Sequence, residues 1–170
     1  QALEDRRRQQ GDSVAMVQPL GGDQVRRYSW NEVEDEAYRM AAYLKAEGIQ
    51  AGDRVALVSK NCAEWIIADL AIQVCGAIHV PVHTPLTGSQ IAYQISDSGA
   101  HIVLISDQEQ AEKMAAVPVE LPGDLQVVSY SPCPVEIGGT PTLCLDKLLR
   151  EVGASEGTEQ QNWESSVQAD

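Results

Sequence analysis

The stretch GDRVALVSKNCAEWIIADLAIQVCGAIHVPVHTP (residues 52–85) decides the fold. Its first part, 54–59, is a continuous apolar run with a polar end, which is typical of a β-strand buried on both faces. A helical segment over 62–74 follows, with Asn61 and Glu64 expected to cap its start, and it is stopped by Gly76. Few of the side chains in this helix are polar, namely Glu64, Asp69 and Gln73. A second apolar run at 77–82 completes a predicted β-α-β unit.

The predicted helix over 62–74 is apolar on almost every side. Such a helix has to be covered on almost every side, and a chain of 170 residues rarely covers one helix so completely. The pattern therefore favours a place for this helix inside something larger. On the isolated chain, the apolar helix and an incomplete sheet predict exposed apolar surface, and hence self-association.

Most of the downstream sequence repeats this unit. Thr87 and Gln90 form a capping box that starts a surface helix, and Gly99 ends it. The segments that follow are a strand at 101–106, a weak helix to about 116, a strand at 125–130 and a short helix at 143–152. Strands that alternate with helices in this way predict a parallel sheet with right-handed crossovers.

The upstream sequence predicts a hairpin and one more helix. Strands at 13–18 and 24–29 flank a glycine turn, which favours an antiparallel hairpin. Ser29 and Glu32 then form a capping box ahead of an amphipathic helix. The polar residues 1–12 leave two interpretations open, a basic arm or a short solvated helix.

These elements place the chain in the α/β class. We expect a mainly parallel sheet with flanking helices and an N-terminal β-hairpin. One unit should cover residues 1–152, followed by a polar tail or linker over 153–170.

The net charge of −13 is unevenly distributed. Residues 1–60 carry 9 basic and 10 acidic side chains, whereas residues 61–170 carry 3 basic and 15 acidic ones. A nucleic-acid-binding protein needs a cationic face, so the composition argues against nucleic acid as a partner. We interpret the acidity as a means of solubility rather than recognition.

The candidate metal ligands do not form a plausible site. The four cysteines are not spaced as C-x-x-C, which argues against a zinc or redox site: Cys62, Cys75, Cys133 and Cys144. His79 and His83 lie in an extended segment that separates their backbones by about 13 Å. That distance is too large for one shared ion, so no metal ligand is expected.

The sequence contains none of the common catalytic or phosphate-binding patterns. The turns after the predicted strands lack the glycines of a dinucleotide fingerprint or a P-loop. Spacing alone assembles no nucleophile–base pair. We therefore assign no catalytic, cofactor-binding or metal-binding residue. The chain also shows no signal peptide and no transmembrane segment, which predicts a cytoplasmic location.

Several motifs together resemble the adenylate-forming (AMP-binding) enzyme superfamily. The segments at 28–44 and 74–82 resemble the first two sequence motifs of that family. PVHTPLT at 81–87 and DSGA at 97–100 are most similar to the long- and medium-chain fatty acyl-CoA synthetase branch. The resemblance extends in consistent order over about residues 13–170.

The resemblance implies an acid–thiol ligase of lipid metabolism. In the full enzyme, a fatty acid carboxylate would attack ATP with Mg²⁺ to give an acyl-adenylate and pyrophosphate. The acyl group would then pass to the thiol of CoA. Membrane association of the full enzyme is a further expectation from the lipid substrate.

The chain departs from the family pattern because the phosphate loop, the adenine- and ribose-binding motifs and the C-terminal lysine domain are missing. We therefore interpret it as an N-terminal fragment that binds no cofactor and has no adenylation activity. The alternative is a free-standing flavodoxin-like or receiver-like module for binding or regulation. A receiver would need an acidic pair after its first buried strand, where the sequence has Ser59, Lys60 and Asn61.

Overall fold

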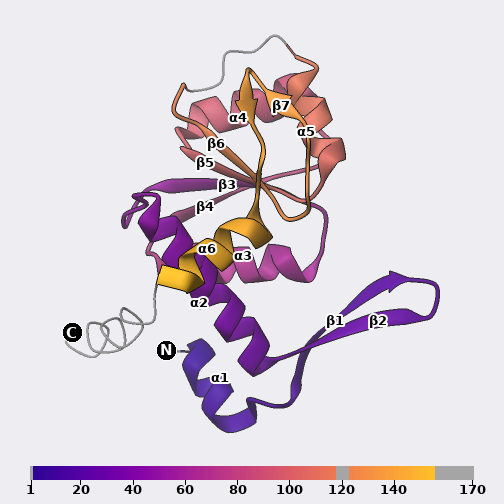
Figure 1. Cartoon of the computed structure of the whole chain (residues 1–170), viewed down its shortest axis with the longest axis vertical. Helices are drawn as coiled ribbons and strands as arrows, with labels where there is room; N and C mark the ends of the chain where they lie inside the picture. Colours follow the sequence, from indigo (N-terminus) through magenta and orange to yellow (C-terminus); the bar gives the residue numbers. More distant parts are fainter. Residues whose placement is uncertain (1, 118–122, 156–170) are drawn as a thin grey trace.

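The computed structural model describes residues 2–117 and 123–155 (Figure 1). Its helices are α1 (Ala2–Gln10), α2 (Trp30–Ala46), α3 (Ala63–Val74), α4 (Gly88–Ser98), α5 (Gln108–Ala115) and α6 (Leu145–Ser155). Its longer strands are β1 (Val14–Gly21), β2 (Gln24–Ser29), β3 (Arg54–Val58), β4 (Ile78–Val82), β5 (Ile102–Ile105) and β6 (Gln126–Ser129). Its two-residue strands are β7 (Glu136–Ile137), β8 (Thr140–Pro141) and β9 (Leu143–Cys144).

A five-stranded parallel sheet forms the centre of the molecule, in the order β4-β3-β5-β6-β9. The predicted α/β class, the parallel sheet and the N-terminal hairpin are therefore confirmed. Numbered by their own sequence, the strands follow the order 2-1-3-4-5 of flavodoxin-like folds. Topology alone would thus also fit the alternative of a free-standing flavodoxin-like module.

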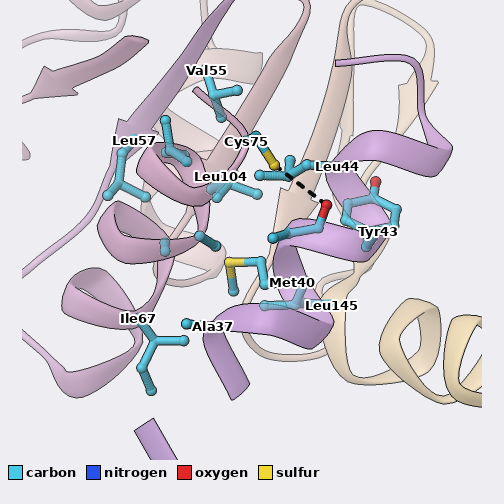
Figure 2. Close-up of a cluster of buried hydrophobic side chains, with 14 of the residues drawn as sticks. Ala37, Met40, Tyr43, Leu44, Val55, Leu57, Ile67, Cys75, Leu104 and Leu145 are labelled. Atoms are coloured by element: carbon cyan, nitrogen blue, oxygen red, sulfur yellow. Dashed lines mark hydrogen bonds between the residues drawn. The ribbon is translucent and has the colours of Figure 1, made fainter. Parts of the chain in front are cut away.

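One face of the sheet is covered by α2, α3 and α6. Val55, Leu57 and Leu104 point from the strands into a fully buried cluster (Figure 2). Cys75, at the end of α3, donates a hydrogen bond from Sγ to the carbonyl oxygen of Ala41 on α2, at 3.4 Å. Because burial raises the pKa of this thiol, Cys75 acts as a small apolar core residue.

The opposite face of the sheet is covered by α4 and α5. Alternate strand residues point to this side, because side chains of a strand alternate between faces. Ile91 and Ile95 of α4 pack with Ala111 and Met114 of α5 over the strands. Gly88, at the start of α4, lies so close to α5 that an added Cβ would be 2.0 Å from the carbonyl oxygen of Lys113.

Two of the predicted helix caps are confirmed, and a third is wrong. Capping boxes start α2 at Ser29 and α4 at Thr87. For α3, we expected Asn61 and Glu64 to form the cap, but the N-cap residue is Cys62 and its side chain makes no capping hydrogen bond. Instead, Gln18 Oε1 of the hairpin accepts the hydrogen bond of the first helical N–H, at Ala63.

The β1–β2 hairpin projects away from the α/β body, and its root lies beside α2 (Figure 1). Residues 2–10 form a helix, which decides between the two interpretations of the N-terminal segment. Arg7 fixes this helix to α2, since its Nη1 lies 2.6 Å from Asp35 Oδ1.

The C-terminal part differs from the expectation in detail. The helix expected at 143–152 is preceded by the two-residue strand β9 and extends to Ser155. The small hairpin of β7 and β8 was not predicted. The rest of the expected polar tail, 156–170, lies outside the described residues.

Candidate functional site

The carboxyl ends of β3 and β5 form the best candidate site. These strands are neighbours in the sheet, but the chain leaves β3 toward α3 on one face and leaves β5 toward α5 on the other. In open α/β sheets, ligands bind at such a point, because the loops diverge there and leave a crevice.

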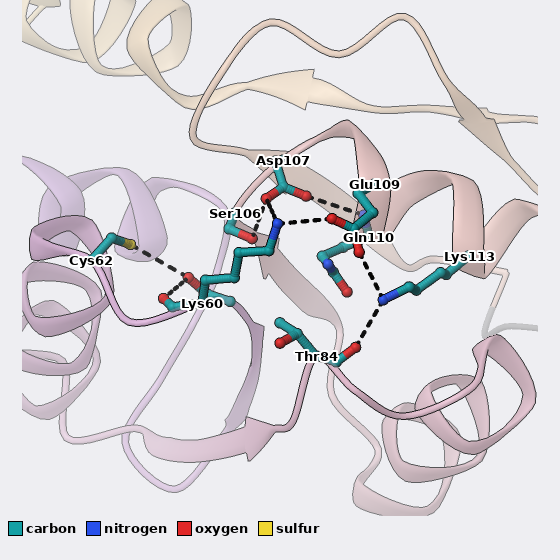
Figure 3. Close-up of polar contacts among 9 residues, drawn as sticks. Lys60, Cys62, Thr84, Ser106, Asp107, Glu109, Gln110 and Lys113 are labelled. Carbon is teal, nitrogen blue, oxygen red and sulfur yellow. Dashed lines mark hydrogen bonds and ion pairs between the residues drawn. The ribbon is translucent and has the colours of Figure 1, made fainter. Parts of the chain in front are cut away.

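An ion-pair network crosses this point (Figure 3). Lys60 Nζ, after β3, lies 3.2 Å from Asp107 Oδ2 and 2.8 Å from Glu109 Oε2, both after β5. Lys113 Nζ lies 3.0 Å from Glu109 Oε1 and donates to the carbonyl oxygen of Thr84 at 3.0 Å. The loops after β3, β4 and β5 are thereby tied together.

The charges of the network compensate one another. Hydrogen bonds from Lys60 and Lys113 lower the pKa of Glu109, and those to Glu109 and Asp107 raise the pKa of Lys60. The side chains of Lys60 and Glu109 are 53% and 54% exposed, so solvent screens their attraction. Two lysines face two carboxylates, so the network offers no excess positive charge to an anion.

Gln110 is buried next to this network. It lies among Lys60, Lys113 and Thr84 in Figure 3. Neither Nε2 nor Oε1 has a hydrogen-bond partner among the described residues, although the side chain is 0% exposed. A buried amide of this kind is normally satisfied by water or by another polar group.

The helix N-termini around the crevice are already capped. The side chain of Asp107 accepts a hydrogen bond from the Gln110 N–H of α5, and that of Thr87 caps α4. The side chain of Gln18 accepts the hydrogen bond of the first N–H of α3. A helix N-terminus binds phosphate through free N–H groups. One N–H of each helix is therefore occupied, and the turns around the crevice lack the glycine clusters of a phosphate-binding loop.

The described histidines are paired with carboxylates or exposed, and no hydrogen bond joins any of them to Cys62. His79 Nδ1 lies 2.7 Å from Asp69 Oδ1, and its ring packs edge-on against Trp65 at 5.2 Å. His83 is exposed in the loop after β4. Cys62 Sγ lies 3.5 Å from Ser59 Oγ, but burial raises the pKa of the thiol and keeps it protonated. No group of three or more His, Cys, Asp or Glu residues could hold a metal in the described part of the chain.

The turns that form this site were visible in the sequence, but their proximity to one another was not. The pairing partners Lys60 and Glu109 are 49 positions apart. The available signal was a lysine after the first parallel strand and an acidic residue after the third. Only the 2-1-3 strand order makes these two positions neighbours.

Comparison with known proteins identifies the family. The family model described as AMP-binding enzyme matches residues 3–144. The crotonobetaine/carnitine–CoA ligase of Escherichia fergusonii is 30% identical, covering 80% of this chain and 30% of that protein. The long-chain-fatty-acid–CoA ligase FadD15 of Mycobacterium bovis is 31% identical, covering 73% of this chain and 19% of that protein.

Solved structures agree with the sequence matches. The anthranilate CoA ligase AuaEII, in complex with anthranoyl-AMP, superposes with a TM-score of 0.73 at 25% identity, covering 88% of this chain and 26% of that one. The chain thus spans less than a third of the length of these relatives.

Within the described residues, no helix has the length and apolar character needed to cross a bilayer. The chain belongs to the AMP-binding enzyme family.

Proposed function

We propose that these residues form the N-terminal α/β framework of an ATP-dependent fatty acyl-CoA ligase. The observation that carries the proposal is the family match over residues 3–144, together with relatives that are named as CoA ligases. The complete enzyme would join a carboxylate to ATP and then transfer the acyl group to CoA. ATP, Mg²⁺ and CoA would be its cofactors.

A fatty acid is the substrate class that we favour. Support comes from the match to a relative named as a long-chain-fatty-acid–CoA ligase and from the PVHTPLT and DSGA motifs. Other relatives are named for crotonobetaine/carnitine and for anthranilate, so the names of the relatives agree on CoA ligation but not on the acid.

The 170 residues by themselves should not form an adenylate. The described helix N-termini around the crevice are capped, and Lys60 and Lys113 are both paired with carboxylates. Adenylation needs donors that stabilise the charge developing on the transferred phosphate. In this proposal the framework positions loops, and groups outside the described residues supply the chemistry.

The proposal is tested with the complete product of the gene that encodes these residues. CoA thioester formation is measured with ATP and Mg²⁺ on palmitate, crotonobetaine and anthranilate in parallel. We expect kcat/KM to be highest for palmitate. Higher activity on either of the other acids would reject the fatty-acid assignment, and no ligation of any acid would reject the ligase.

A free-standing flavodoxin-like or receiver-like module is the second candidate, because the strand order 2-1-3-4-5 is that of flavodoxin-like folds. Titration of the chain with FMN, followed by flavin fluorescence, tests a flavin site. Saturable binding would favour this candidate over the ligase framework.

Location and non-lipid partners remain predictions. We propose a cytoplasmic enzyme that can associate with membranes when it collects a lipid substrate. The acidic composition continues to predict no binding to nucleic acid.

A further inference from the structure

The β1–β2 hairpin carries exposed apolar side chains that the rest of the described chain does not cover. Four large ones are exposed, namely Val14 (52%), Val17 (51%), Leu20 (57%) and Val25 (42%). The other side of the ribbon packs on the body through Met16 and Tyr28. A two-stranded ribbon is marginal in water, and additional strands normally stabilise it.

Among the described strands, β2 pairs with β1 alone, so its outer edge is open to another strand. In an antiparallel ladder, residues opposite each other alternate between hydrogen-bonded and non-hydrogen-bonded pairs. Pro19 lies opposite Val25 and has no N–H, so we assign this pair to the non-hydrogen-bonded kind. Because such pairs alternate along an antiparallel ladder, the N–H and C=O groups of Val25 and Arg27 point outward. The edge of β1 lacks the donor at Pro19, which leaves β2 as the better edge for pairing.

The sequence of this edge is complementary to itself. Arg27 lies two residues after Val25 in β2, and Asp23, in the turn that precedes β2, lies two residues before it. If a second β2 pairs in antiparallel orientation with Val25 opposite Val25, each Arg27 lies opposite the Asp23 of the other copy. Opposite charges and branched apolar residues are favourable cross-strand pairs. Both Asp23 and Arg27 are exposed and thus available for such contacts.

We propose that the chain forms a two-fold symmetric dimer by pairing β2 with β2 of a second copy, centred on Val25. The result is a four-stranded antiparallel sheet with an apolar row of Pro19 and Val25 from both copies. An interface in which the same surface meets itself is the usual form of a two-fold dimer.

Charge favours this surface over others on the chain. Residues 61–170 carry 3 basic and 15 acidic side chains, so the α/β bodies of two copies repel one another. The hairpin points away from the body (Figure 1). Antiparallel pairing at Val25 places the two copies of Ser29, the hairpin residue next to α2, about 27 Å apart. The two α2 helices therefore begin on opposite sides of the interface.

The dimer differs from the self-association that the sequence led us to expect. That expectation placed the exposed surface on the apolar helix at 62–74, whereas most of α3 is covered by α2 and the sheet. Ile66 is the large apolar side chain of α3 that is exposed, at 42%. The dimer is independent of the proposed enzymatic function.

Sedimentation velocity of the 170-residue chain tests the dimer over about 10 µM to 1 mM, the range suited to a small interface. The wild type should shift from monomer to dimer with concentration. Arg27→Glu places like charges opposite Asp23 twice per dimer, so it should weaken dimerisation about tenfold. The double variant Asp23→Arg/Arg27→Glu should restore it to within about threefold of the wild type.

Arg8→Glu on α1 is the matched control, since it changes the net charge equally at an exposed position off the hairpin. It should dimerise like the wild type. A monomer throughout the concentration range overturns the proposal, as does a dimer that Arg27→Glu leaves unchanged. A dimer that Arg8→Glu weakens as much as Arg27→Glu also overturns it, since net charge would then control association.

Oxidative cross-linking provides a second measurement. Opposed Val25 residues in this register have Cα atoms about 5.5 Å apart, within the range of a disulfide. Val25→Cys should form a covalent dimer in mild oxidant, whereas Val17→Cys, on the far strand with the same native cysteines, should not. Equal cross-linking of both variants would contradict the register.

Discussion

Two nearly identical tetrapeptides have opposite environments in this molecule. VAMV at 14–17 lies in the hairpin, where its first and last valines are 52% and 51% exposed. VALV at 55–58 lies in the central sheet, where all four residues are 0% exposed. The apolar pattern is the same, so layers of helices on both faces make the difference. An apolar run predicts a strand, but neighbours decide its burial.

The largest expected effect contrasts the equivalent valines of the two tetrapeptides. Val58→Ala removes two methyl groups from a closed core and leaves a cavity, so it should lower the free energy of unfolding by about 2.5 kcal/mol. Val17→Ala makes the same change at a half-exposed position and should cost no more than about 0.5 kcal/mol. Urea unfolding followed by circular dichroism measures both values. Equal losses would mean that the hairpin is as well covered as the sheet.

A second test probes the tight packing of the body. Gly88→Ala places a Cβ 2.0 Å from the carbonyl oxygen of Lys113, so α4 and α5 must separate. We expect a loss of about 2 kcal/mol in the free energy of unfolding. Gly123→Ala is the control, because no atom of the described residues lies within 4 Å of its added Cβ. A Gly88→Ala variant as stable as this control would contradict the close approach of the two helices.

The third test concerns the hydrogen bond that ties the hairpin to the body. Gln18→Ala leaves the N–H of Ala63 without its acceptor and should cost about 1 kcal/mol. Hydrogen exchange, measured by mass spectrometry, should speed up in β1 and β2 more than in β3. Gln24→Ala, at an exposed hairpin position, serves as the comparison. Unchanged exchange in β1 and β2 would show that this bond does not hold the hairpin.

The smallest effect is expected in the ion-pair network at the carboxyl edge. Since Lys60 and Lys113 lower the pKa of Glu109, its contribution to stability is present above the unfolded pKa and is lost as pH falls through the folded pKa. NMR titration of the Glu109 carboxylate should give a midpoint below that of an ordinary glutamate. Lys60→Gln should raise this midpoint, and added salt should do the same. If neither Lys60→Gln nor added salt shifts the midpoint of Glu109, the ion pairs of Glu109 with the lysines do not exist in solution.

Local chemistry explains what the sequence could predict. The capping boxes at Ser29 and Thr87 depend on residues three positions apart, so they were visible in the sequence and are confirmed. The parallel strands were visible as apolar runs. The cap of α3 was not visible, because Gln18 lies 45 positions before Ala63.

The candidate site depends on topology, which sequence patterns do not specify. The carboxylates that pair with Lys60 belong to Asp107, the N-cap of α5, and to Glu109 in the first turn of α5. The strand order places this helix start beside the loop after β3. The two-residue strands β7, β8 and β9 carry too few residues to show a period. The family, by contrast, was identifiable from motifs and is confirmed by the match over residues 3–144.

If these residues form a framework whose adenylation chemistry depends on other groups, the purified 170-residue chain should not catalyse ATP–pyrophosphate exchange. Exchange is measured with radiolabelled pyrophosphate, Mg²⁺ and palmitate. We expect a rate no higher than in a control without protein. Palmitate-dependent exchange catalysed by this chain would show instead that the framework carries out adenylation itself.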